Sequence, residues 1–159
     1  MLVRRGIAYV AGVATKKMTK TRASTDRILK ELRAFGLGYP GAHLKSPWPD
    51  HMDLAVRDKT FTYLSTEGAP LALSCKLPHS GVDALALPFT KPTAYGLGKS
   101  GWVSADFSNV KDIPVALLKE WIDESYRAQA PKKLVAELES RSTPAKTTKK
   151  KPPRRRTAK

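Results

Sequence analysis

The hydrophobic positions in the first part of the chain recur at helical spacing. Ser24-Thr25-Asp26, residue types that often cap helices, precede apolar side chains at Ile28, Leu29, Leu32 and Phe35. This spacing predicts a helix that Gly36 and Gly38 end. The next residues, 39–49, contain three prolines and predict a loop or an edge strand.

Three segments with strand-like patterns follow this loop. Residues 52–57 alternate, with Met52, Leu54 and Val56 on one face. Residues 60–65 are rich in β-branched and aromatic side chains, and residues 71–77 alternate again. The connections at 58–59 and 66–69 are short, so we expect an antiparallel meander.

The second half of the chain predicts a helix, two strands and a longer helix. Residues 80–87 begin with cap chemistry at Ser80 and end before Pro88. Residues 93–97 and 101–107 are typical of two strands joined by a hairpin turn at 98–100. Asp112 is a predicted N-cap, with Pro114 in the first turn of the following helix. One face of that helix carries Leu118, Trp121, Ile122, Ser125 and Tyr126.

After Pro131, residues 132–139 predict a short amphipathic helix with Leu134, Val135 and Leu138 facing inward. The predicted order is helix, three strands, helix, two strands, helix. Strands grouped in this way favour an α+β fold with a mostly antiparallel sheet. We expect helices to cover one face of the sheet and the other face to be partly solvated.

The net charge of +15 is concentrated at the two ends of the chain. Residues 1–22 hold six Lys or Arg and no acid, and residues 140–159 hold nine and no acid. The remaining 14 basic residues balance 14 acids in residues 23–139. We therefore predict a basic N-terminal extension, a neutral folded domain over 23–139 and a basic tail over 140–159.

The N-terminal extension has two interpretations that the sequence leaves open. Residues 6–14 are apolar and follow Arg4-Arg5, the outline of a short signal peptide. Alternatively, Met18 is the true start and residues 1–17 are an upstream extension. No run approaches the roughly 18 apolar residues of a membrane-spanning helix, so we expect no membrane span.

Several short segments, in this order and spacing, resemble the MmcQ/YjbR family of small bacterial proteins over about residues 25–130. They are Tyr39-Pro40-Gly41-Ala42, the strands around Asp58-Lys59, residues 95–103 and the helix residues 121–126. The resemblance implies an α+β, two-layer fold of the YjbR or CyaY type. It also implies DNA binding through hairpins of the domain, and it does not extend to either basic end.

The tail is the clearest functional feature of the sequence. From Ser140 onward it has no aliphatic residue larger than alanine, and three prolines separate its basic clusters, so we expect it to be disordered. We expect it to neutralise nucleic-acid phosphates, with a log K against log salt slope of about −8 if all nine charges engage duplex DNA. The predicted contacts are Lys146, Lys149, Lys150, Lys151, Arg154, Arg155, Arg156 and Lys159. The open alternative is a tail that solubilises the protein or attracts any polyanion.

Aromatic residues beside cations mark two further segments. Tyr95, Lys99 and Trp102 surround the predicted hairpin turn, where an aromatic ring could stack on a base. The alternative is that Trp102 anchors the hairpin in the core. His43 and Trp48 flank Lys45 and allow the same two interpretations.

No motif for catalysis, phosphate cradling or a cofactor stands out. Residues 96–101 are glycine-rich but lead into a strand, which favours a hairpin turn over a P-loop. His51, Asp50 and Asp53 are close in sequence, and we expect them to be surface loop residues and not a metal site. Cys75, the only cysteine, is predicted to be buried.

These patterns predict a non-enzymatic DNA-binding protein without cofactor or metal. The partner is DNA, or RNA, contacted through phosphates, and the expected location is cytoplasmic and nucleoid-associated. The alternative is that the neutral domain is a protein-interaction or small-ligand module that the tail localises to polyanions.

Overall fold

The computed structural model describes residues 10–49 and 51–142, with side chains from residue 22 onward. Within this part of the chain lie four α-helices and a six-stranded antiparallel sheet of strand order β1-β2-β3-β4-β6-β5. The strands are β1 (Ala42–Lys45), β2 (Asp53–Val56), β3 (Lys59–Leu64), β4 (Ala72–Lys76), β5 (Thr90–Pro92) and β6 (Trp102–Asp106). The helices are α1 (Val10–Leu37), α2 (Gly81–Leu85), α3 (Val115–Gln129) and α4 (Lys132–Ser142), with a 3₁₀ turn η1 (Leu97–Ser100). The predicted α+β class is confirmed.

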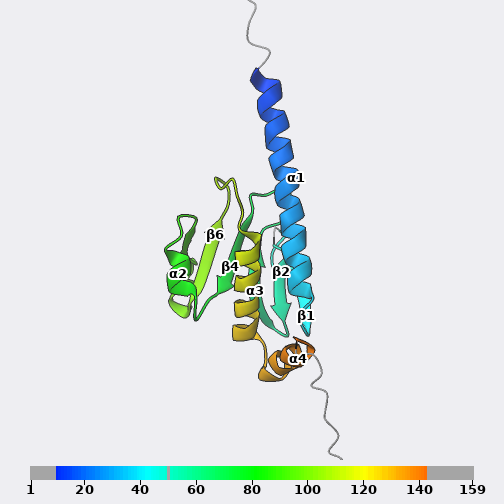
Figure 1. Ribbon diagram of the computed structural model, residues 1–159, viewed down its shortest axis with the longest axis vertical. Helices are drawn as coiled ribbons and strands as arrows, with labels where there is room; N and C mark the ends of the chain where they lie inside the picture. The colour runs from blue at the N-terminus through cyan, green and yellow to red at the C-terminus, as the bar shows by residue number, and fades with distance from the viewer. Residues whose placement is uncertain (1–9, 50, 143–159) are drawn as a thin grey trace, which may run out of the picture.

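The helices pack on one face of the sheet. In Figure 1, α1 and α3 lie side by side over the sheet, and α3 packs on β3 and β4 while α1 packs on β1 and β2. Helix α2 packs on β5 and β6. In β4, Leu73 and Cys75 are buried beneath the helices, whereas Ala72, Ser74 and Lys76 alternate with them and are half-buried. These three residues belong to the face that no helix of the described chain covers.

The core lies between the sheet and the two long helices. Among the largest fully buried side chains, α1, β3 and α3 contribute Leu29, Leu32, Phe61, Leu64, Leu118, Ile122 and Tyr126. The predicted inward face of the long second-half helix is confirmed, since all five of its residues are buried in α3. Burial of each large apolar side chain contributes about 1.5–3 kcal/mol.

The first helix begins far upstream of its predicted start. Helix α1 starts at Val10, so Ser24, Thr25 and Asp26 lie inside it and not at its N-cap. The Asp26 carboxylate instead accepts a hydrogen bond from the Gly68 N–H at 3.0 Å, which fixes the loop after β3 to the helix. The boundary that charge alone placed at residue 22 therefore falls within one continuous helix.

The predicted meander of three strands is confirmed as β2, β3 and β4, and the proline-rich segment supplies the edge strand β1. A bulge in β3 makes Leu54 pair with Thr62 and Ala55 with Thr60. Phe61 is the extra residue of this bulge, and both Phe61 and Thr62 are buried.

The strand before β6 was predicted in the wrong place. Strand β5 covers Thr90–Pro92, whereas residues 93–96 lead through a turn into η1, which begins at Leu97. Tyr95 and Gly96 both have positive φ, at 58° and 77°, which a regular strand cannot contain.

The ends of the later helices also differ from the predictions. Ser80 does not cap α2 through its side chain, and Pro114, not Asp112, is the N-cap residue of α3. Helix α4 continues to Ser142, so residues 140–142 belong to the folded body and not to the tail.

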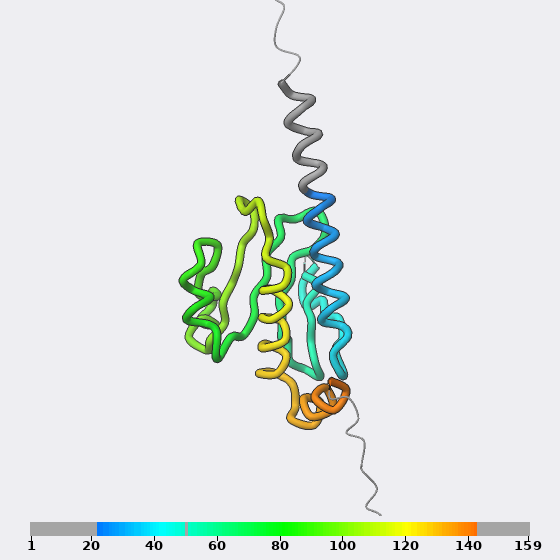
Figure 2. The backbone as a smooth tube through the Cα atoms, in the orientation of Figure 1, coloured from blue at the N-terminus to red at the C-terminus, as the bar shows by residue number. Residues whose placement is uncertain are grey.

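Helix α4 closes one end of the molecule. In Figure 2 it lies below α3 and beside the turn that joins α1 to β1. Leu134 and Leu138 pack against the core as predicted, and Val135 is half-buried. A Cβ on Gly41 would lie 3.0 Å from a methyl group of Leu134, and Gly41 has a φ of +69°, so this close contact requires glycine.

Candidate nucleic-acid interface

The predicted tail contacts, from Lys146 to Lys159, lie outside the described residues. Arg141 does not belong with them, because it lies in α4 and forms an ion pair with Glu137. Eight basic residues and no acid therefore follow the folded body.

The turn between β5 and β6 presents Tyr95 to solvent. The Tyr95 side chain is fully exposed, and Lys99 on η1 is also exposed. Backbone hydrogen bonds fix the turn: the Thr93 N–H donates to Trp102 O at 3.1 Å and the Gly98 N–H to Thr93 O at 3.0 Å. An exposed aromatic ring on a rigid turn loses little entropy when it binds a partner.

The glycines of this turn allow its shape. Gly96 and Gly101 have φ of 77° and 84°, a region that glycine enters freely. A Cβ on Gly98 would lie 2.7 Å from the Cβ of Pro92, so this position has no room for a side chain. Tyr95 shares the left-handed conformation without being glycine, and such strained residues are enriched at binding sites.

Trp102 is not part of this exposed surface. It is 5% exposed, and its ring packs against Tyr63 with 5.2 Å between centroids. This burial favours the interpretation that Trp102 anchors the hairpin over the one in which its ring stacks on a base. Sequence alternation could not separate the two, because Trp102 belongs to the helix-free face and is nevertheless buried there.

Trp48 shows the opposite outcome in the proline-rich loop. Its side chain is 67% exposed, so it does not anchor this loop in the core. Nearby His43 is exposed, and the Lys45 ammonium donates to the Asp58 carbonyl at 3.3 Å. These residues form a second exposed segment that contains an aromatic ring and a cation.

The helix-free face carries a row of polar residues that crosses the sheet. Pairing places Lys45 opposite Asp53 on β1 and β2, Tyr63 opposite Ser74 on β3 and β4, and Ser104 opposite both Ser74 and Lys91. Sequence analysis missed this row. The alternation of polar and apolar positions in β4 and β6 could have indicated this row. Lys91 was missed because β5 was predicted at the wrong residues.

Three hydroxyl groups of this face form a chain. Ser74 Oγ lies 2.6 Å from Ser104 Oγ, which lies 2.9 Å from Thr93 Oγ1. Two hydrogen bonds use two of the three hydroxyl protons. The third proton can be donated to an acceptor outside the chain of hydroxyls.

Asp53 does not lie in a surface loop as predicted. It is fully buried at the start of β2, and one carboxylate oxygen accepts the Leu64 N–H at 3.1 Å. Burial raises the pKa of Asp53, an effect that this hydrogen bond and His51 oppose. Burial, and then the charge of Asp53, also raise the pKa of Tyr63, which keeps this phenol protonated as a donor.

The described residues contain no group of three His, Cys, Asp or Glu placed to hold a metal ion. Cys75 is fully buried as predicted, and burial raises the pKa of its thiol to about 12. A thiol with this pKa is a poor nucleophile at neutral pH. No helix in residues 10–49 and 51–142 is long and apolar enough to cross a membrane.

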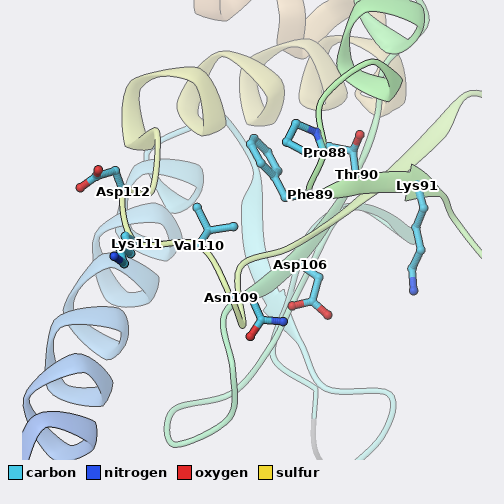
Figure 3. A pocket seen from close by; sticks show the side chains of 9 residues that line it. All are labelled: Pro88, Phe89, Thr90, Lys91, Asp106, Asn109, Val110, Lys111 and Asp112. Carbon is cyan, nitrogen blue, oxygen red and sulfur yellow. The ribbon is translucent and has the colours of Figure 1, made fainter.

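An open pocket of about 820 Å³ lies beside β5. In Figure 3, Lys91 comes from β5, whereas Asn109 and Lys111 come from the loop before α3. Asp106 also lines it, and hydrogen bonds from the Ser108 hydroxyl and N–H lower the pKa of Asp106. Lys91 therefore belongs both to the edge of this pocket and to the polar row.

A comparison with protein-family models matches the YjbR model to residues 37–128, more than half of the chain. The chain belongs to the YjbR family. No curated protein matches it. The fold is similar to that in the crystal structure of the Deinococcus radiodurans protein DR2400, of the domain family DUF419, with a TM-score of 0.54. The two are 24% identical, over 69% of this chain and 86% of the other.

Within the YjbR region, the Tyr39-Pro40-Gly41 segment after the first helix contacts α3. The Tyr39 ring stacks on Tyr126 with 4.5 Å between centroids, and the Tyr126 hydroxyl donates to Pro40 O at 2.7 Å. The Tyr39 hydroxyl donates to Asp123 at 2.8 Å. This segment therefore attaches the turn after α1 to α3, and its role in the YjbR region is structural.

Proposed function

We propose that this protein is a non-enzymatic DNA-binding protein whose basic C-terminal tail supplies sequence-independent affinity. The observation that carries the proposal is the distribution of charge. Residues 143–159 hold eight Lys or Arg and no acid, while residues 23–139 are balanced at 14 of each sign. Phosphate neutralisation by such a segment releases counterions and provides most of non-specific binding. The proposal places the protein in the cytoplasm, on the nucleoid.

In this proposal, two exposed residues of the folded body add DNA contacts to those of the tail. Tyr95 and Lys99 are both exposed and lie on a turn that backbone hydrogen bonds hold in shape. Base stacking on an exposed ring is tolerant of sequence. The proposal assigns them an auxiliary contact and assigns the main affinity to the tail.

The test replaces the tail charges and keeps the full chain. In one variant all eight basic residues after Ser142 become glutamine, and in a matched control each Lys becomes Arg and each Arg becomes Lys. Duplex affinity at 100 mM salt should fall by at least a hundredfold in the first variant and stay within threefold in the control. Equal affinity of the neutral variant and the natural chain would overturn the proposal.

A second candidate function rests on the pocket beside β5. Its lining combines the apolar Pro88, Phe89 and Val110 with the polar Lys91 and Asn109, a mixture typical of small-ligand sites. In this alternative the body is a small-ligand or protein-interaction module and the tail only localises it. A Lys91→Gln variant that loses a small-molecule ligand while keeping all DNA affinity would favour this alternative.

A further inference from the structure

The helix-free face between β4, β6 and β5 offers hydrogen-bond donors and positive charge. Ser74, Ser104 and Thr93 form the chain of hydroxyls, which has one proton left to donate. Lys91 lies opposite Ser104 in the register of β5 and β6. Lys76 lies two residues from Ser74 on the same face of β4. Hydroxyl and ammonium donors of this kind suit an oxyanion.

The acids of this face offset only part of this charge, since Asp106 is exposed and the charge of Lys91 contributes to lowering the pKa of Asp106. Asp53 is fully buried and bound to the Leu64 N–H, and its row neighbour Lys45 lies on the far edge strand. Asp106 accepts hydrogen bonds from the Ser108 N–H at 2.8 Å and from the Ser108 hydroxyl. The half of the face toward β5 therefore carries two lysines, Lys76 and Lys91, against the exposed carboxylate of Asp106, and keeps a positive balance for a negative partner.

Tyr95 adds a contact that only an unpaired base can use. It follows Thr93 by two residues, so its Cα lies within about 7 Å of the Cα of a residue in the hydroxyl chain. Its ring is fully exposed. A duplex keeps its bases stacked on each other, whereas the bases of a single strand are free to stack on an aromatic side chain.

We propose that this surface, formed by Ser74, Lys76, Lys91, Thr93, Tyr95 and Ser104, is the body's own binding site for a single nucleic-acid strand. The hydroxyl chain and the two lysines bind the phosphodiester backbone, and Tyr95 stacks on a base. The site deepens the proposed function and rests on it for the class of partner. It differs from the tail in preferring unpaired strands.

The experiment uses the full chain with the eight tail charges replaced by glutamine, so that the body's contribution is measured alone. At 50 mM salt, this protein should bind a fluorescent 12-nucleotide oligo-dT more tightly than a 12-base-pair duplex. Lys76→Gln with Lys91→Gln should weaken oligo-dT binding about tenfold and reduce the salt slope by about 1.4. Tyr95→Ala should weaken it about tenfold without changing the slope.

The matched control is Lys132→Gln with Lys133→Gln, which removes the same charge from exposed positions on α4. It should leave affinity for oligo-dT within twofold. On titration with oligo-dT, the amide NMR signals of Ser74, Thr93 and Ser104 should shift, while those of buried α3 residues such as Ile122 stay in place.

Three results would overturn this site: no oligo-dT binding by the tail-neutral protein, preference for the duplex, or an equal loss in the α4 control. The tail proposal is judged separately, by duplex affinity of the natural and tail-neutral chains with Lys76 and Lys91 intact. The two measurements therefore distinguish failure of this site from failure of the tail proposal.

Discussion

Tyr95 and Trp102 are close in sequence, but the fold gives their rings opposite environments. Tyr95 is fully exposed, while Trp102 is packed against Tyr63 and is 5% exposed. We predict that Trp102→Ala lowers the free energy of unfolding by about 3–5 kcal/mol, as for other large buried aromatics. Tyr95→Ala should change it by less than about 1 kcal/mol. Urea unfolding of both variants tests this, and a similar loss in both would contradict the assignment of Tyr95 to the surface.

The buried carboxyl group of Asp53 predicts a pH-dependent contribution to stability. Its second oxygen has no hydrogen-bond partner among the described residues, and burial raises its pKa above the ordinary value of 3.8. A raised pKa in the folded state means that folding favours the protonated form. The stability this gives is present at low pH and is lost as pH rises from 3.8 through the raised value.

The test compares the natural protein with Asp53→Asn, which cannot ionise. From pH 4 to pH 8, the unfolding free energy of the natural protein should fall relative to that of the variant. Urea titrations at three pH values measure the difference. A difference that stays constant or grows with pH would show that the folded carboxyl is not destabilised by burial.

The Ser125 side chain of α3 forms hydrogen bonds to two strands of the sheet, β3 and β4. The Lys76 N–H donates to Ser125 Oγ at 2.8 Å, and the Ser125 hydroxyl donates to the Phe61 carbonyl. Ser125→Ala would leave a buried donor and a buried acceptor unpaired, so we predict a loss of about 1–3 kcal/mol in unfolding free energy. Ser140→Ala is the control, because that hydroxyl bonds only to the exposed Glu137 carbonyl in α4. Equal effects in the two variants would contradict this role.

Glu124, the neighbour of Ser125 in sequence, connects α3 to the start of α2. Its carboxylate accepts the His79 N–H at 2.8 Å, the Ser80 N–H at 3.1 Å and the Ser80 hydroxyl at 2.6 Å. Burial alone would raise the pKa of Glu124, but these hydrogen bonds lower it. Ser80, predicted as an N-cap through its own side chain, therefore acts as a donor to another helix.

At the scale of elements, the sequence patterns correctly predicted the features that depend on the spacing of neighbouring residues. The inward face of α3 was predictable because five residues repeat at helical spacing. The start of α1 was not, because Asp26 resembles a cap in sequence and the carboxylate's actual partner, Gly68, lies 42 residues away. The position of β5 was missed because Tyr95 has a positive φ, which the pattern of residue types around a tyrosine does not predict.

The site was only partly predictable for the same reason. Tyr95 and Lys99 were found from local composition and are exposed. Ser74, Ser104 and Lys91 are brought together only by the pairing of β4, β6 and β5. This pairing cannot be read from the sequence. A polar row across strands becomes visible only once the register is known.

For the whole molecule, charge and fold are largely separate. The YjbR region and α4 form a nearly neutral body, in which Arg141 is paired with Glu137. The remaining eight basic residues of the C-terminal segment follow Ser142. The family match covers the folded body, whereas the basic charge proposed to bind DNA lies after this body in the sequence. The body and the tail therefore need separate tests.

The most direct test is the salt dependence of duplex DNA binding by the full chain and by the chain with its eight tail charges replaced by glutamine. Plotted as log K against log salt between 50 and 300 mM, the slope of the full chain should be steeper by about 7, the value for eight neutralised phosphates. Equal slopes for the two proteins would contradict the claim that the tail supplies the affinity.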